Sequence, residues 1–155
     1  MHRDLKPQNI MLTGTRQEQI KIIDLGSATA ATTNRTKTSN AGTTTYMSPE
    51  KATGAGHYSY ADDMWAAGCI MAEMLTLRLM THLFPGGVYA AAASSHLSYA
   101  RLLEELKSSD GLLGGIATAL LQVKQEMRPR ALEVALVLAD STQTLSSPLR
   151  FCKSH

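Results

Sequence analysis

Of all segments of the chain, the eight residues from His2 to Asn9 constrain the possible structures most. They read His-Arg-Asp-Leu-Lys-Pro-Gln-Asn, so three different polar groups lie within six residues. Asp4 supplies a carboxylate, Lys6 an ammonium group and Asn9 an amide. A carboxylate can accept a proton, an ammonium group can neutralise an anion and an amide oxygen can bind a metal ion. The plainer interpretation is a turn or a helix start, where Asp, Pro and Asn are also common.

The composition is that of one globular domain, because 44% of the 155 residues are apolar and 18% are charged. A net charge of +2 is too small to indicate a nucleic-acid or membrane partner. The most apolar window, residues 64–80, contains Glu73 and Arg78 and therefore predicts a buried helix rather than a membrane span. Cys69 and Cys152 form no metal-binding spacing and no disulfide framework, so we expect free thiols in a reducing compartment.

Four further segments follow this stretch in order. Residues 10–23 contain two short apolar runs around a Gly-containing polar loop, which predicts a β-hairpin, and Asp24-Leu25-Gly26 comes directly after it. Residues 27–48 hold eleven Ser or Thr and no acidic residue, a composition that also fits a flexible polar linker. Residues 60–75 are apolar nearly all round after two initial Asp residues, which predicts a helix buried on most sides.

Taken together, the segments resemble the eukaryotic Ser/Thr protein kinases. Residues 2–9 match the kinase catalytic loop, and Asp24-Leu25-Gly26 matches the D-F-G motif with Leu in place of Phe. Residues 42–50, Gly-Thr-Thr-Thr-Tyr-Met-Ser-Pro-Glu, resemble the end of an activation segment, with Ser48 where Ala is usual. Within it, Met-Ser-Pro-Glu also resembles the same segment of kinases that act in relay cascades. The Asp-Met-Trp at residues 63–65 and the Arg-Pro-Arg-Ala at residues 128–131 resemble motifs of two later kinase helices.

The resemblance implies a fold and its boundaries. Residues 1–140 are expected to form a kinase C-lobe, mainly α-helical with one small β-hairpin, and residues 141–155 a polar, frayed tail. After a loop at residues 84–87, we expect helices at residues 90–106 and 113–123. The last helix is expected to begin near Arg128 and continue to Ala139.

The resemblance also implies the roles of the catalytic and cofactor-binding residues. Asp4 would orient the substrate hydroxyl and accept its proton, Lys6 would neutralise the transferred phosphoryl group, and Thr43 would help to seat the peptide acceptor. The implied cofactors are ATP and Mg²⁺. Asn9 and Asp24 would be the metal ligands, and Met11 would lie under the adenine ring, although a plain core methionine explains Met11 equally well.

Six further residues would support the site rather than take part in the chemistry. Leu25 would act as an apolar plug, Glu50 would form an ion pair with Arg128, and Asp63 would accept backbone hydrogen bonds from the catalytic loop or merely cap its helix. The full set of supporting residues comprises His2, Arg3, Leu25, Glu50, Asp63 and Arg128.

A phosphorylation switch is expected within residues 24–50. Arg3 would be a cation without a partner beside the metal site, and a phosphate opposite it would order the segment. Ser39, three residues before Gly42, is the first candidate and Thr38 the second. A soluble loop without a switch is the simpler alternative.

The implied function is ATP-dependent phosphorylation of Ser or Thr in protein substrates, since Lys6 favours Ser/Thr over Tyr specificity. We find no Gly-rich phosphate loop, no Val-Ala-Ile-Lys motif and no helix before the catalytic loop, so we expect the N-lobe to be absent and the chain alone to be inactive. The alternatives are a non-catalytic kinase-like protein that binds kinase partners or substrates, and a degraded gene product. The expected partners are a protein substrate and an upstream activating kinase. With no secretory signal in the first nine residues, we expect a cytoplasmic or nuclear location.

Overall fold

The computed structural model describes residues 1–15, 19–30, 44–54, 59–109 and 111–146. As predicted, these residues are mostly helical, with one two-stranded antiparallel sheet. None of the helices among them is both long and apolar enough to cross a membrane. In chain order the elements are η1 (Pro7–Asn9), β1 (Ile10–Thr13), β2 (Gln19–Ile22), η2 (Leu25–Ser27), η3 (Thr44–Tyr46), α1 (Pro49–Thr53), α2 (Tyr60–Thr76), α3 (Met80–Leu83), α4 (Val88–Ala93), α5 (Leu97–Ser108), α6 (Gly111–Leu120), η4 (Gln125–Met127) and α7 (Ala131–Ser146).

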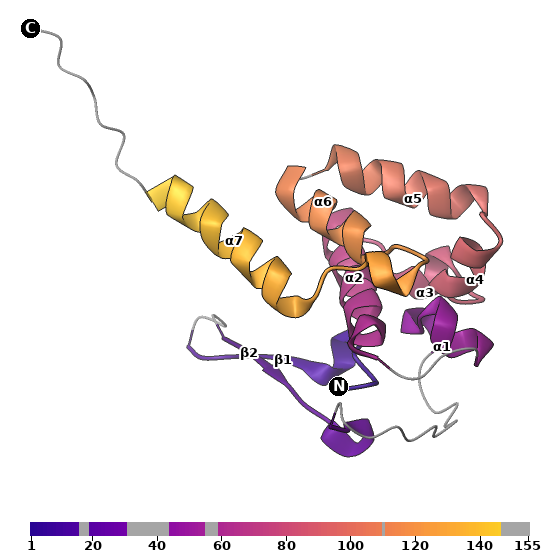
Figure 1. Ribbon diagram of the computed structural model, residues 1–155, viewed down its shortest axis with the longest axis horizontal. Helices are drawn as coiled ribbons and strands as arrows, with labels where there is room; N and C mark the ends of the chain where they lie inside the picture. Colours follow the sequence, from indigo (N-terminus) through magenta and orange to yellow (C-terminus); the bar gives the residue numbers. More distant parts are fainter. Residues whose placement is uncertain (16–18, 31–43, 55–58, 110, 147–155) are drawn as a thin grey trace, which may run out of the picture.

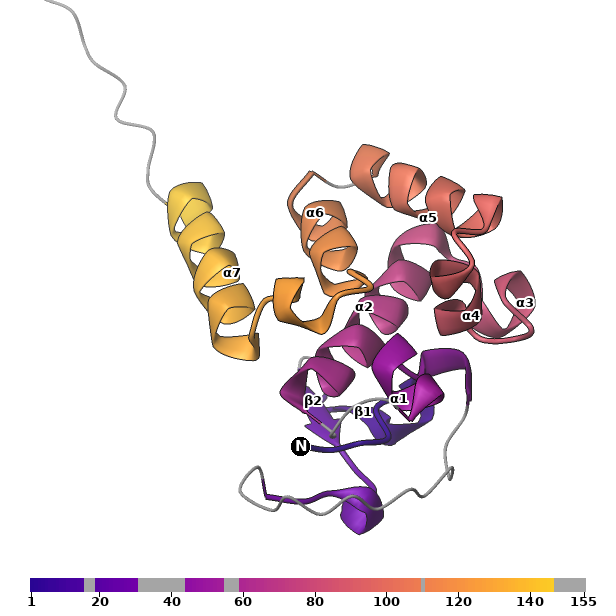
Figure 2. The ribbon, with the colours of Figure 1, turned by 45° about the vertical axis from the view of Figure 1, so that its right-hand side comes forward.

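Helix α2 runs through the middle of the helical body, with α5 and α6 along one side (Figures 1 and 2). Its start is fixed by a capping box, in which the Ser59 hydroxyl accepts a backbone N–H and the Asp62 carboxylate accepts the Ser59 N–H. Gly68 lets α6 approach closely, because a Cβ atom there would lie 2.8 Å from Leu120 Cβ. The helix ends at Leu77, whose φ of 54° is left-handed.

The core is built around α2 from apolar residues of η3, α3, α4, α5 and α6 and of the turns between them. Trp65 is completely buried, and its ring stacks on that of Tyr99 of α5 at a centroid distance of 6.5 Å. The prediction that α2 is buried on most sides is confirmed, although Met74 remains 71% exposed. The core cluster consists of Tyr46, Trp65, Ala66, Cys69, Ala72, Met80, Phe84, Val88, Ala92, Tyr99, Leu102, Leu106, Ala117 and Leu121.

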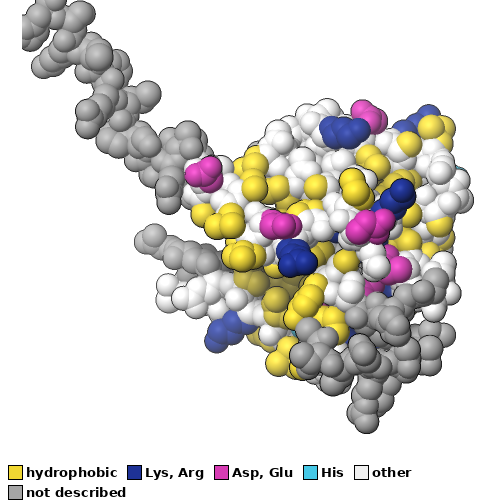
Figure 3. Space-filling model, viewed as in Figure 1, with side chains coloured by type: hydrophobic (Ala, Val, Ile, Leu, Met, Phe, Trp, Pro, Cys, Tyr) yellow, Lys and Arg dark blue, Asp and Glu magenta, His cyan; other side chains and the backbone are white. Residues whose placement is uncertain are grey.

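The predicted β-hairpin is present, and its register pairs Ile10 with Ile22 and Thr13 with Gln19. It lies outside the core, with Leu12, Ile20 and Ile22 all more than half exposed. Helix α7 also stands apart from the helical body in both ribbon views (Figures 1 and 2). Hydrophobic side chains gather along α7 and in the recess between it and the hairpin (Figure 3). A large apolar surface is therefore open to solvent in the described part of the chain.

Three of the predicted helices have other bounds in the structure. The helix expected at residues 113–123 is α6 and spans Gly111–Leu120. The single helix expected at residues 90–106 is two helices, α4 and α5, because the chain turns at Ser95, where φ is +50°, and the His96 side chain then caps α5. The last helix does not stop at Ala139 but continues to Ser146, within the stretch expected to be a frayed tail. Its continuation contains no Gly or Pro that would end a helix before Ser146.

Candidate active site

The segment at residues 2–4 is held by the start of α2. The backbone N–H groups of His2 and Arg3 donate to the two carboxylate oxygens of Asp63, at 2.7 and 2.8 Å. Arg3 has a φ of 74°, a left-handed conformation that non-glycine residues rarely adopt. The bonds to Asp63 hold this conformation, so Asp63 has the contacts that were expected of it.

Three predicted side chains converge just after this anchor. The Lys6 ammonium group lies 2.8 Å from Asp4 Oδ2. Asn9 Nδ2 donates to the Asp4 carbonyl at 2.8 Å and lies 3.4 Å from Asp4 Oδ2. The short helix η1, which begins with Pro7, turns the chain back and makes this convergence possible. The structure thus brings a carboxylate, an ammonium group and an amide into one cluster.

The His2 ring connects the cluster to the segment after the hairpin. Its Nδ1 accepts the Asp4 N–H at 3.4 Å, so the ring proton lies on Nε2, which donates to the Ile23 carbonyl at 3.0 Å. The Ile23 N–H in turn donates to the Asn9 carbonyl at 2.9 Å. These bonds bring the residue before Asp24 next to Asn9, although the two residues are fourteen positions apart in the sequence.

Asp24 adopts a left-handed backbone, with φ of 61°, and its Oδ1 accepts the Gly26 N–H at 3.3 Å. The expectation for Leu25 is not met, because its side chain is 66% exposed and does not act as a buried plug. A plug needs apolar neighbours on all sides, and the described residues provide too few of them. Met11 lies on β1 opposite Lys21 and is about half exposed.

The donor set near the cluster fits a magnesium ion. Because Asn9 Nδ2 donates to Asp4, the amide oxygen Oδ1 remains available as a ligand, and Asp24 has a carboxylate oxygen that does not bind Gly26. Within the described ranges no group of three or more His, Cys, Asp and Glu side chains could hold a metal ion. Magnesium does not require such a group, since it binds through one or two protein oxygens plus the phosphates of its substrate.

The end of the Ser/Thr-rich segment is anchored to α2 at two points. The buried Tyr46 hydroxyl donates to Glu73 Oε1 at 2.9 Å, and burial together with this carboxylate raises the pKa of Tyr46. Ser48 is buried, caps α1 through the Lys51 N–H and donates its hydroxyl proton to Asp62 Oδ1. Burial raises the pKa of Asp62, and the Ser48 hydrogen bond partly offsets this rise.

The predicted ion pair between Glu50 and Arg128 is present and bidentate. Arg128 Nη1 lies 2.5 Å from Glu50 Oε1, and Nη2 lies 2.7 Å from Oε2. Arg128 also donates to the carbonyls of Gln122, Ala61 and Val123, and its guanidinium group lies 5.0 Å from the centre of the Trp65 ring. The pair connects α1 to the segment that precedes α7.

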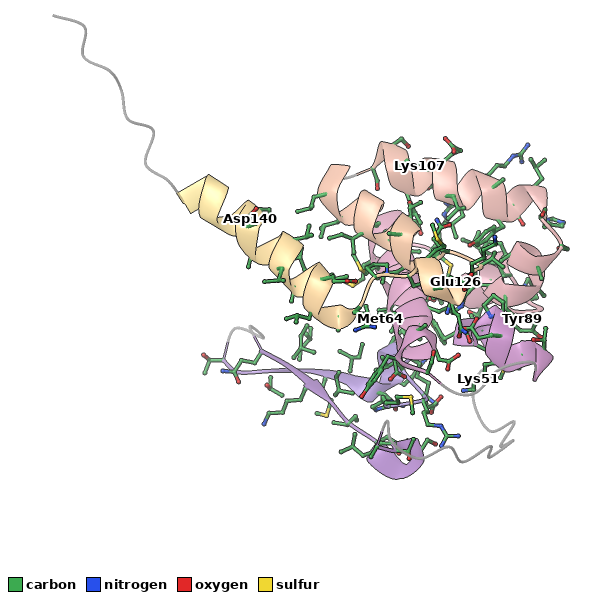
Figure 4. The ribbon with its side chains drawn as sticks, in the orientation of Figure 1. Lys51, Met64, Tyr89, Lys107, Glu126 and Asp140 are labelled. Atoms are coloured by element: carbon green, nitrogen blue, oxygen red, sulfur yellow. The ribbon has the colours of Figure 1, made fainter. Side chains whose placement is uncertain are left out.

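Sequence reasoning missed Lys51, which comes from α1 (Figure 4). Its ammonium group donates to the Arg3 carbonyl at 3.0 Å. Both this bond and the bond to Asp63 are made by the Arg3 backbone and not by its guanidinium group, so the expected role of that cation stays a prediction. No sequence signal indicated Lys51, whereas the Ser59-x-x-Asp62 spacing could have indicated Asp62.

Three predicted residues, Thr43, Ser39 and Thr38, lie outside the described residues.

Comparisons with known proteins give a consistent result. The family model described as protein kinase domain matches residues 1–135. Cyclin-dependent kinase E-1 of Arabidopsis thaliana is 45% identical over 83 residues, which cover 50% of this chain and 18% of the relative. Cyclin-dependent kinase B1-1 of the same plant is 45% identical over 87 residues, covering 56% of this chain and 27% of the relative. Cyclin-dependent kinase B2-1, also from that plant, is 47% identical over 77 residues, which cover 49% of this chain and 24% of the relative. The chain thus spans roughly a quarter of the length of these relatives.

Proposed function

Because the chain belongs to the protein kinase family, we propose that it forms the C-lobe of a Ser/Thr protein kinase. In that role it would contribute to transfer of the γ-phosphate of ATP to hydroxyl groups of protein substrates. The observation that supports this most is the cluster of Asp4, Lys6 and Asn9, held on the start of α2 by Asp63. A non-catalytic relative would not need this arrangement of groups.

Each residue of the cluster has a proposed role in phosphoryl transfer. Asp4 orients the substrate hydroxyl and accepts its proton as the oxygen–phosphorus bond forms and the bond to the ADP leaving group breaks. Lys6, paired with Asp4 in the structure, neutralises charge on the transferred group. Asn9 and Asp24 hold magnesium, which screens the phosphate charges when it is bound. Met11 is proposed to contact the adenine ring and Thr43 to seat the acceptor.

The substrate class and partners of the whole protein follow from the family. Lys6 favours Ser or Thr as the acceptor. Since the matched relatives are named cyclin-dependent kinases, a cyclin-like subunit is a proposed partner of the complete protein. Nucleotide binding is proposed to need a second lobe in addition to this chain. The likeness to relay-cascade kinases stays a prediction.

We also propose regulation by phosphorylation at Ser39 or Thr38. The support is the density of Ser and Thr in residues 27–48 and the two cations, Arg35 and Lys37, close to both candidates. Replacing Ser39 and Thr38 together by Ala should remove the response to an activating kinase or to a phosphatase. Equal activity of both proteins under both treatments would mean that the segment is no switch.

The test of the main proposal is phosphate transfer by a complete kinase domain that contains residues 1–155. Asp4→Asn should lower kcat by on the order of a thousandfold, the contribution of one well-placed catalytic group. Asp24→Asn should weaken metal-dependent nucleotide binding. Glu126→Gln is the matched control, since this carboxylate is exposed on η4 (Figure 4). Unchanged transfer by Asp4→Asn would refute the catalytic assignment, and a complete domain that binds no Mg-ATP would favour a non-catalytic interaction protein.

A further inference from the structure

A hollow lies at the other end of α2 from the active-site cluster. It is a pocket of about 310 Å³ where the chain after α2, the end of α3 and the start of α5 meet. Figure 2 shows α3, α4 and α5 side by side in this region. The seventeen residues of α2 separate its two ends by roughly 24 Å, at 1.5 Å per residue. A molecule bound in this pocket would therefore leave the cluster of Asp4, Lys6 and Asn9 uncovered.

The floor of the pocket is apolar. Phe84 and Leu102 line it, and both side chains belong to the buried core. Leu97, the first residue of α5, also lines the pocket and is 60% exposed. The volume is at the small end of the range for ligand pockets, which suits one or two apolar side chains better than an inorganic anion.

The rim of the pocket carries positive charge. Arg78, Arg101, His96 and Glu105 line it, and Arg78 forms an ion pair with Glu105, which leaves Arg101 as the excess positive charge among the described lining residues. No hydrogen bond or ion pair is found for the Arg101 side chain among the described residues. His96 Nδ1 accepts the Ser98 N–H at 3.2 Å, which leaves the Nε2 proton available to an acceptor. The N-terminus of α5 adds a partial positive charge at the same place.

An apolar floor below a basic rim complements a peptide in which a Leu or Phe side chain is flanked by carboxylates. We propose that this pocket docks such an acidic, apolar segment of a protein partner. Apolar side chains would fill the hollow above Phe84 and Leu102, and carboxylates would pair with Arg101 and the Nε2 proton of His96. This inference is independent of catalysis, since none of these residues belongs to the active-site cluster.

The test measures fluorescence anisotropy of labelled nine-residue peptides with the full 155-residue chain. The panel has a central Leu or Phe flanked by Asp and Glu, the same peptides flanked by Lys, and acidic peptides with a central Ser. Arg101→Glu should weaken binding of the acidic, apolar peptides by about tenfold or more, the value of a charge-assisted hydrogen bond. The same variant should gain affinity for the Lys-flanked peptides. Leu97→Asp should also weaken binding of the acidic, apolar peptides.

Lys107→Glu is the matched control, because Lys107 is on the same helix but does not line the pocket (Figure 4). It should change binding by less than about twofold, since exposed charges that do not contact a ligand contribute little. Circular dichroism of each variant should show an unchanged fold, as Arg101, Leu97 and Lys107 are all exposed. The proposal is overturned if central Leu, Phe and Ser peptides bind equally well, or if Lys107→Glu weakens binding as much as Arg101→Glu. Equal competition by a single-stranded oligonucleotide would also overturn it, because charge alone would then explain the binding.

Discussion

Replacing Arg128 by Met should destabilise the folded chain more than any exposed substitution. The guanidinium group is fully buried, with 0% of the side chain exposed, and Glu50 is only 14% exposed. Removing Arg128 would leave the Glu50 carboxylate in a largely buried position without its two hydrogen bonds, and would leave the carbonyls of Gln122, Ala61 and Val123 without this donor.

The expected loss is about 3–5 kcal/mol, the usual effect of breaking a buried ion pair by removing one partner. Folded domains are stable by only about 5–15 kcal/mol, so the variant should lie close to the unfolding threshold. In the double variant Glu50→Gln/Arg128→Met neither of these two positions carries a charge. We therefore expect its loss to be smaller than the sum of the two single losses by about 0.5–3 kcal/mol.

Urea unfolding followed by tryptophan fluorescence measures these losses, because Trp65 is the only tryptophan and is completely buried beside Arg128. Arg78→Met is the control, since the Arg78–Glu105 pair is about half exposed and such pairs contribute about 0–1 kcal/mol. A loss for Arg128→Met no larger than that of the control would refute the reasoning. Additive single losses would show that the two side chains are not energetically coupled.

Three other predictions concern the exposed surface, one carboxylate and one thiol. The apolar surface of the hairpin and α7 should bind a hydrophobic dye in the native chain, and a complete kinase domain should bind less of it; equal binding by both would contradict this. Since burial raises the pKa of Asp62 above its ordinary value of 3.8, the folded state binds more protons, so stability should fall as pH rises from 3.8 to the folded-state pKa. Thermal melts at pH 3.5 to 7 measure this dependence, and Asp62→Asn should remove the fall in stability. An unchanged pH dependence in this variant would count against the role of Asp62. In a Cys152→Ser variant, Cys69 should react with a thiol reagent only after unfolding, because it is buried and burial raises its pKa; fast native labelling would disprove this.

Much of the catalytic loop could be predicted because its residues are close in sequence. Asp4, Lys6 and Asn9 lie within one short turn, so their spacing already places them near one another. The hairpin and α2 were also predictable, since both depend on local patterns: alternate apolar runs around a Gly loop and a capped apolar helix. The break between α4 and α5 was not predictable, because a run of alanines favours a continuous helix. The turn depends instead on the left-handed Ser95 and on packing beyond it.

The sequence by itself determined which chemical groups are present and which family they indicate, since motif residues and helix caps act over a few neighbouring positions. The tertiary structure decided which distant groups meet. Lys51 contacts the Arg3 carbonyl, Ser48 donates to Asp62 and Arg101 shares a pocket with Arg78, and no residue spacing specifies any of these contacts. They arise because packing of the elements brings distant residues together. In the buried pair of Ser48 and Asp62, each side chain supplies the partner that burial of the other polar group requires.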